Sequence, residues 1–107
     1  MRSATSPTYT VEICIAGDHA DAVRICRQFC MESGFCVTVT PTIYVYTGGA
    51  ENGVIVRCVN YPRFPTLPGE LFAKAQALAE QLRVGLCQHS FSLIAPDKTL
   101  WVTEREE

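Results

Sequence analysis

The sequence lacks a long hydrophobic run, which argues against a membrane-spanning helix. No window reaches the roughly 18 consecutive apolar residues that cross a bilayer. The first seven residues also lack the apolar stretch of a secretory signal. We therefore predict a cytoplasmic protein with no membrane partner. The composition, 48% hydrophobic and 19% charged over 107 residues, is typical of one globular domain.

A surplus of positive charge is also missing. Nine Lys and Arg stand against eleven Asp and Glu, which gives a formal net charge of −2. Proteins that bind nucleic acid usually carry a basic excess, because contacts with phosphate supply much of the affinity. The charge balance therefore disfavours a nucleic acid partner.

No familiar catalytic motif is present: we find no G-x-S-x-G, P-loop, G-x-G-x-x-G or HExxH sequence. Asp18, His19, Asp21, Glu51 and His89 are expected near one end of the domain, and histidines beside carboxylates suit acid–base or metal chemistry. Their spacing matches no known arrangement, so we interpret Asp18 as a helix cap and the histidines as solvated. We predict no catalytic residue, no metal and no cofactor.

Six cysteines occur without a single CxxC pair. The missing secretory signal argues against disulfides. Cys26, Cys30 and Cys36, with the distant Cys87 and His89, do not have the spacing of a zinc module. Because Cys26 and Cys30 fall on the apolar stripe of an expected helix, we predict that they pack in the core.

The first half of the chain reads as strand, helix, strand. Residues 9–15 alternate apolar and polar side chains, as a half-buried strand does. A helix is expected to begin after the N-cap Asp18 and to end at Gly34. Residues 35–46 are rich in β-branched and aromatic side chains, and Pro41 within them indicates an edge strand or a bulge. Residues 47–53 have the composition of a turn.

The second half repeats this order and adds a strand. We expect strands over 54–61, 89–95 and 100–103, and a helix that starts near Thr66 and carries an apolar stripe from Leu71 to Leu82. Residues 1–8 are expected to form a disordered tail, 9–103 the domain, and 104–107 an acidic tail. The βαββαβ order predicts an α+β, ferredoxin-like sandwich with both helices on one face of the sheet and an extra C-terminal hairpin strand.

The sheet face without helices is expected to be apolar and aromatic, which often marks a partner surface. We predict that this face binds a second copy of the chain or a host protein, unless the chain's own ends fold over it. The expected interface residues are Tyr44, Tyr46, Ile55, Arg57, Val59 and Trp101.

A second candidate site precedes the second helix. Asn60, Tyr61 and Arg63 lie just before its N-terminus, where backbone N–H groups favour an anion and a guanidinium adds a paired donor. We predict ligand binding there, with a nucleotide signal as one suitable ligand. The simpler interpretation is a rigid connector.

Several segments give the chain a resemblance to known proteins: Ala16-Gly17-Asp18, residues 22–32 and 36–42, Tyr46-Thr47-Gly48-Gly49, Asn60-Tyr61-Pro62-Arg63-Phe64-Pro65 and residues 95–99. Over nearly its whole length the chain resembles small uncharacterised proteins encoded by phages and prophages. The resemblance implies an accessory protein that acts in the host cytoplasm and assigns no activity to any residue.

Together these observations favour a non-enzymatic anti-defence protein that inhibits a host protein through its open sheet face and forms oligomers. One alternative is a protein that sequesters a nucleotide signal at Asn60, Tyr61 and Arg63. The other is a small acid–base or metal-dependent enzyme.

Overall fold

The computed structural model describes residues 1–106 and contains five strands and two helices. In chain order the elements are β1 (Thr10–Ala16), α1 (His19–Ser33), β2 (Val37–Tyr46), β3 (Gly49–Val59), α2 (Pro68–Gly85), β4 (Ser90–Ile94) and β5 (Thr99–Thr103). No helix within the described residues has the length and apolar character to cross a membrane. Glu107, the last residue of the expected acidic tail, lies outside the described residues.

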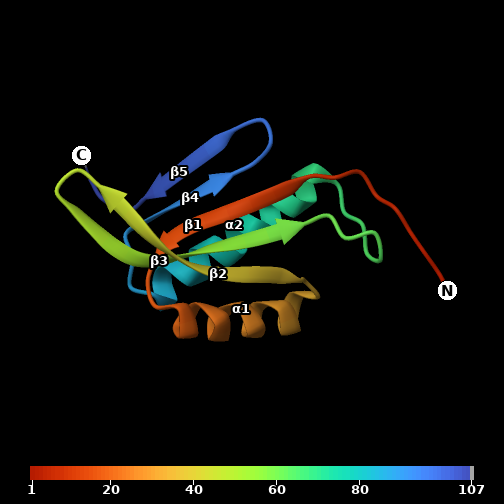
Figure 1. Ribbon diagram of the computed structural model, residues 1–107, viewed down its shortest axis with the longest axis horizontal. Helices are drawn as coiled ribbons and strands as arrows, with labels where there is room; N and C mark the ends of the chain where they lie inside the picture. Colours follow the sequence, from red (N-terminus) through yellow and green to blue (C-terminus); the bar gives the residue numbers. More distant parts are fainter. Residues whose placement is uncertain (107) are drawn as a thin grey trace.

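The strands form one antiparallel sheet in the order β2-β3-β1-β4-β5 (Figure 1). The order β1-α1-β2-β3-α2-β4 along the chain gives the predicted ferredoxin-like α+β fold. Strand β5 pairs with β4 and is the predicted extra hairpin strand. Both helices pack on one face of the sheet, α2 against β1 and β4, and α1 against β2. The predicted edge strand is also confirmed: β2, which contains Pro41, lies at one border.

Alternating side chains divide the sheet into a covered and an open face. Val11, Ile13 and Ile15 of β1 lie beside Cys58, Val56 and Val54 of β3, and all six are buried. The apolar stripe of α2 completes this core through Leu71, Ala75, Leu78, Ala79 and Leu82. Burial of these side chains is the main driving force for the fold.

The ends of α1 form as the sequence predicts. Asp18 adopts an extended conformation, and its Oδ2 accepts a hydrogen bond from the Asp21 N–H at 3.0 Å. Gly34 closes the helix at φ 62°, in the left-handed region that glycine adopts without strain.

Two predicted boundaries are wrong. Residues 47–53 are not all turn, because β3 already begins at Gly49 and Ala50, Glu51 and Asn52 pair with β2. Helix α2 begins at Pro68 rather than near Thr66, with Leu67 at the N-cap and no side-chain cap. Proline at the first helical position has a fixed φ that suits the start of a helix, so no side-chain cap is needed there.

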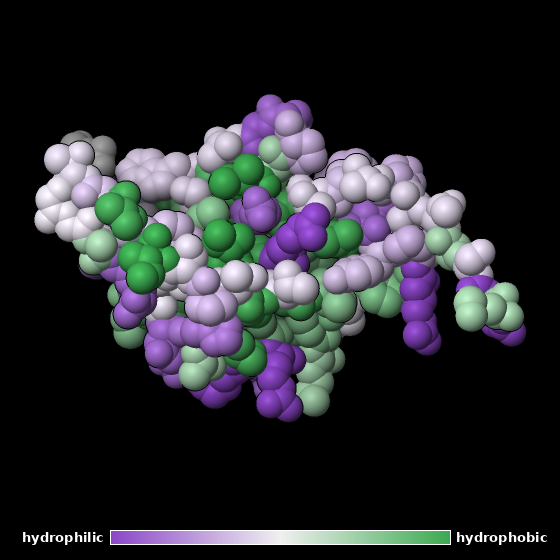
Figure 2. Space-filling view, in the orientation of Figure 1, coloured by the Kyte–Doolittle hydropathy of each residue, from purple (hydrophilic) through white to green (hydrophobic). Residues whose placement is uncertain are grey.

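The open face of the sheet is free of the chain's N-terminal segment. That segment extends past the end of the sheet, at the side opposite the β2–β3 hairpin (Figure 1). Figure 2, in the same view, shows hydrophobic groups interrupted by hydrophilic ones on the surface of the molecule. Ile94 and Trp101 are 40% and 54% exposed, so the open face is accessible to a partner.

Candidate functional site

The candidate site lies where the β2–β3 hairpin, the start of α1 and the α2–β4 link meet. Two adjoining hollows of about 670 and 360 Å³ lie here and share Ala16, Glu51 and Gln88. We call them together the hairpin-end site. The larger one is lined also by Gly17, Asp18, His19, Pro41, Thr42, Ile43, Asn52 and Gly53. The smaller one is lined also by Cys14, Ile15, Tyr44, His89, Ser90, Phe91, Ser92, Trp101 and Arg105.

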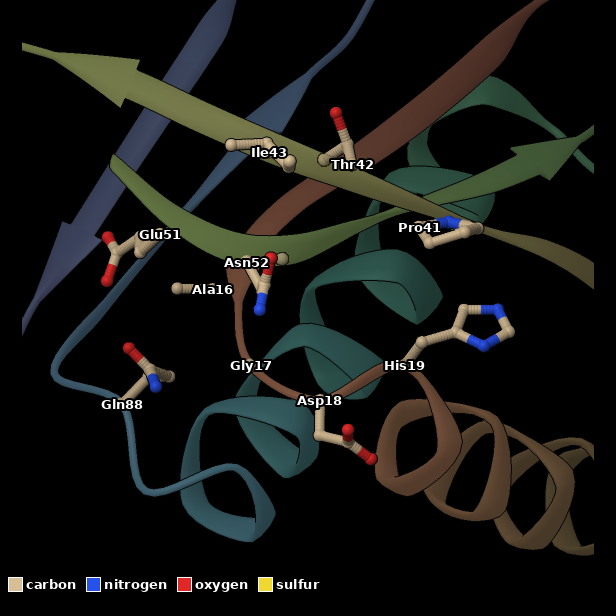
Figure 3. A pocket seen from close by; sticks show the side chains of 11 residues that line it. Ala16, Gly17, Asp18, His19, Pro41, Thr42, Ile43, Glu51, Asn52 and Gln88 are labelled. Atoms are coloured by element: carbon tan, nitrogen blue, oxygen red, sulfur yellow. The ribbon is translucent and has the colours of Figure 1, made fainter. Parts of the chain in front are cut away.

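The volumes of both hollows fall in the range that small-molecule sites occupy. Figure 3 shows Glu51, from β3, and Gln88, from the α2–β4 link, on the same side of the larger hollow, while His19 projects from the opposite side. The side chains that mark the site therefore come from segments far apart in the sequence.

Tyr44 is positioned by the glycine beside it on β3. The side chain lies against Gly53, which is buried; a Cβ added there would come within 2.3 Å of Tyr44 Cε2 and 2.7 Å of the Ile15 carbonyl oxygen. The Tyr44 hydroxyl donates to the Val54 carbonyl oxygen at 2.6 Å. This arrangement leaves Tyr44 half-buried on the wall of the smaller hollow.

The Tyr44 hydroxyl is held in its neutral form. Burial raises its pKa above the usual range, and the neighbouring Cys14 thiol raises it further. Burial also raises the pKa of the Cys14 thiol, although the neighbouring Tyr44 hydroxyl acts in the opposite direction. Neither group therefore supplies an anion at neutral pH. Tyr44 offers the site an aromatic face, because its hydroxyl hydrogen is already donated to the Val54 carbonyl oxygen.

Gly17 allows the turn between β1 and α1 to come close to the α2–β4 link. It has φ 140°, and its N–H donates to the Asn52 carbonyl oxygen at 3.0 Å. A Cβ at this position would lie 2.9 Å from the Leu86 side chain. The turn, the hairpin and the link are therefore packed together as one unit around the site.

Asp18, His19, Glu51 and His89 all line the hairpin-end site, but the two histidines make separate contacts rather than one cluster. Asp18 caps α1, while His19 Nε2 lies 3.3 Å from the Val39 carbonyl oxygen. His89 Nδ1 lies 2.8 Å from Glu104 Oε1. Among residues 1–106, no three His, Cys, Asp or Glu side chains are placed to hold a metal ion.

Cys14 lines the hairpin-end site, and Cys87 belongs to the α2–β4 link beside the wall residue Gln88. Cys26 and Cys58 are buried in the core, and burial raises the pKa of each thiol from 9.0 to about 12. Cys30 and Cys36 are half-buried, and Cys87 is exposed.

Asn60 is a structural clamp at the other end of the molecule. Its Nδ2 donates to the Pro7 carbonyl oxygen at 2.8 Å, and its Oδ1 accepts from the Thr66 N–H at 2.8 Å. Tyr61 packs against Phe64 with ring centroids 5.7 Å apart, and Arg63 is exposed. A hollow of about 150 Å³ in this connector is lined by Tyr61, Phe64 and Thr66, and ligand binding at Asn60, Tyr61 and Arg63 stays a prediction.

The predicted interface residues all lie on the open face of the sheet, and two of them, Tyr44 and Trp101, also line the smaller hollow. Ile55, Arg57 and Val59 of β3 lie on the open face, and Trp101 joins them from β5. Tyr44 lines the hairpin-end site, and Tyr46 is 53% exposed beside the hairpin turn. Binding of a second copy or of a host protein to this face stays a prediction.

Solved structures that share the fold of this chain include two that are described as a phage SAM lyase. A structure described as phage SAM lyase in the apo state superposes with a TM-score of 0.77 at 19% identity, covering 92% of each chain. A second, phage SAM lyase in complex with S-methyl-5'-thioadenosine, gives a TM-score of 0.74 at 17% identity, covering 100% of this chain and 98% of that one. No family model and no curated protein matches the sequence.

These identities show a shared fold. Both matched proteins come from phages, in agreement with the phage accessory protein that the resemblance implied. The prediction of a non-enzymatic inhibitor is wrong, because both structures that match almost the whole chain are described as SAM lyase, an enzyme.

Proposed function

We propose that this chain cleaves S-adenosylmethionine (SAM) at the hairpin-end site. The observation that carries the proposal is the match in fold, over the full chain, to a phage SAM lyase holding S-methyl-5'-thioadenosine. That nucleoside is SAM without its four-carbon amino acid chain. A hollow of suitable size, with aromatic, carboxylate, amide and guanidinium groups on its walls, supports the assignment.

A reaction that needs no water explains why no catalytic motif is required. In the proposed step an oxygen of the substrate's carboxylate attacks its own Cγ, and the C–S bond breaks. The electron pair stays on sulfur, which leaves neutral S-methyl-5'-thioadenosine, and the four carbons close into homoserine lactone. No proton is transferred, so neither a general base nor a protein nucleophile is needed.

The change in charge along this step favours a site of low polarity. The carboxylate and the sulfonium of the substrate carry opposite charges that both vanish as the lactone forms. Water stabilises separated charges more than the dispersed charge of the transition state, so excluding water accelerates the reaction. Tyr44 is half-buried and the indole of Trp101 is 54% exposed, so bound substrate would have to cover these two rings to exclude water from the reacting atoms.

The remaining wall residues would bind and orient the substrate. An aromatic face attracts both an adenine ring and a sulfonium cation. The exposed Glu51 carboxylate suits the α-ammonium group, and the amide of Gln88 suits a nucleoside's hydrogen-bonding edge. Destroying SAM in an infected cell would remove the methyl donor of host DNA modification, a use suited to a phage accessory protein.

The direct test is incubation of the purified chain with SAM, followed by mass spectrometry. We expect S-methyl-5'-thioadenosine and homoserine lactone in equal amounts. Decarboxylated SAM lacks the attacking group and is expected to remain intact. Glu51→Gln should lower kcat/KM, whereas Glu32→Gln, an exposed change on α1, should not. Unchanged SAM after incubation with a stoichiometric amount of enzyme would refute the proposal.

A further inference from the structure

A partly buried arginine of α2 contacts the link that carries Gln88. The Arg83 side chain is only 15% exposed, although it carries a full charge. Its guanidinium meets Glu80 on its own helix, where Nε donates to Oε1 at 3.0 Å. It also meets Glu104, which follows β5, with Nη1 3.0 Å from Oε2. One cation thus joins α2 to the C-terminal segment.

The same guanidinium reaches the link that carries two wall residues of the site. Arg83 Nη1 lies 3.4 Å from the Gln88 carbonyl oxygen, and the Gln88 N–H donates to the Arg83 carbonyl oxygen at 2.8 Å. These two contacts hold the last turn of α2, at Arg83, against the α2–β4 link at Gln88. Gln88 lines both hollows of the site, and its side chain is the only amide that they share.

Glu104 extends the contact to the second wall residue. Its Oε1 lies 2.8 Å from His89 Nδ1, and its N–H donates to the His89 carbonyl oxygen at 2.9 Å. The hydrogen bond from His89 and the charge of Arg83 hold the pKa of the Glu104 carboxyl below its usual range. With Nδ1–H bound to this carboxylate, a neutral His89 presents Nε2 as an acceptor.

We infer that Arg83 is a positioning residue, which holds Gln88 directly and His89 through Glu104 in the orientation that binds the nucleoside. The inference rests on the proposed function and adds residues outside the walls of the site. Because fixed side chains bind a ligand with less loss of conformational entropy, breaking this contact should weaken affinity more than it slows the chemical step.

The two carboxylates that share Arg83 provide a matched pair of variants. Glu80→Gln and Glu104→Gln each remove one negative partner of the same guanidinium, so the loss of a charge partner of Arg83 alone predicts equal effects on ligand binding. Only Glu104 also contacts His89. We expect Glu104→Gln to raise both the Kd for S-methyl-5'-thioadenosine and the KM for SAM about fivefold to tenfold, with kcat nearly unchanged. A change in affinity of this size corresponds to the loss of about one hydrogen bond. Glu80→Gln should change either by less than about twofold.

Calorimetric titration of the full chain with S-methyl-5'-thioadenosine, together with steady-state kinetics, separates the outcomes. If the unaltered chain binds the nucleoside and both variants bind it equally well, the positioning role is overturned while the proposed function stands. If Glu104→Gln lowers kcat without changing KM or Kd, the positioning role is also overturned. If the unaltered chain neither binds the nucleoside nor cleaves SAM, the proposed function itself fails and the inference with it.

Discussion

Replacing Gly53 with alanine tests how the hairpin positions Tyr44. The added methyl group would lie 2.3 Å from Tyr44 Cε2 and 2.7 Å from the Ile15 carbonyl oxygen. The ring can rotate away, but the carbonyl belongs to β1 and is held by the sheet. Overpacking of this kind costs about 1–3 kcal/mol. For a chain of this length, we expect a fall in Tm of roughly 5–15 °C.

Gly69→Ala is the matched control for this change. Gly69 lies in the first turn of α2, and nothing stands within 4 Å of where its Cβ would be. We expect that variant to melt at the same temperature as the unaltered chain or slightly higher, because alanine favours helix. Thermal unfolding followed by circular dichroism measures both.

A double variant separates the two contacts of Gly53. Tyr44→Ala removes the ring and leaves the Ile15 carbonyl in place, so Gly53→Ala should cost less in that background, by about 1 kcal/mol. A Gly53→Ala variant with an unchanged Tm would refute the packing argument, and with it the account of how Tyr44 is held against the site.

Three further outcomes follow from the structure. Asp18→Ala removes the acceptor for the Asp21 N–H and should lower stability by about 1 kcal/mol in urea unfolding, whereas Asp18→Asn should change it little. Raising the pH above 9 should destabilise the fold, because the pKa of Cys26 and of Cys58 is about 12 in the folded chain and 9.0 in the unfolded chain. The stability that is present below pH 9 is therefore lost as the pH rises toward 12. A urea midpoint that stays constant between about pH 8 and 10.5 would contradict this prediction. Cys87 should react with a thiol reagent in the native state far faster than either buried cysteine, and equal rates would show that the core is open.

The order of the elements was predictable because local patterns and the core agree. Each element has a local signal: alternating apolar and polar side chains predict β1, the N-cap Asp18 predicts the start of α1, and an apolar stripe predicts α2. Because βαβ crossovers are almost always right-handed, these elements can form one sheet topology. The beginning of β3 was missed for a physical reason. Ala50, Glu51 and Asn52 are small or polar and lie beyond the helices, so pairing with β2, rather than burial, keeps them extended.

The candidate site was far less accessible to sequence reasoning. Tyr44, Glu51, Gln88 and Trp101 come from four separate segments and share no spacing that a motif could capture. The sequence predicted Tyr44 and Trp101 only as interface residues on an apolar sheet face. It indicated Glu51 only as one of the carboxylates near the two histidines. Gly53 is the sequence feature that could have pointed to this site. It lies inside β3, and a glycine inside a strand often marks a place where another group approaches the backbone closely, as Tyr44 does here.

The origin of the oxygen in the four-carbon product tests the account most directly. When SAM is cleaved in ¹⁸O-labelled water, intramolecular attack predicts that the oxygen bonded to Cγ is unlabelled, because it comes from the substrate's own carboxylate. Label on that oxygen would show that water attacks instead, and recovery of intact SAM would show that the site does not cleave it at all.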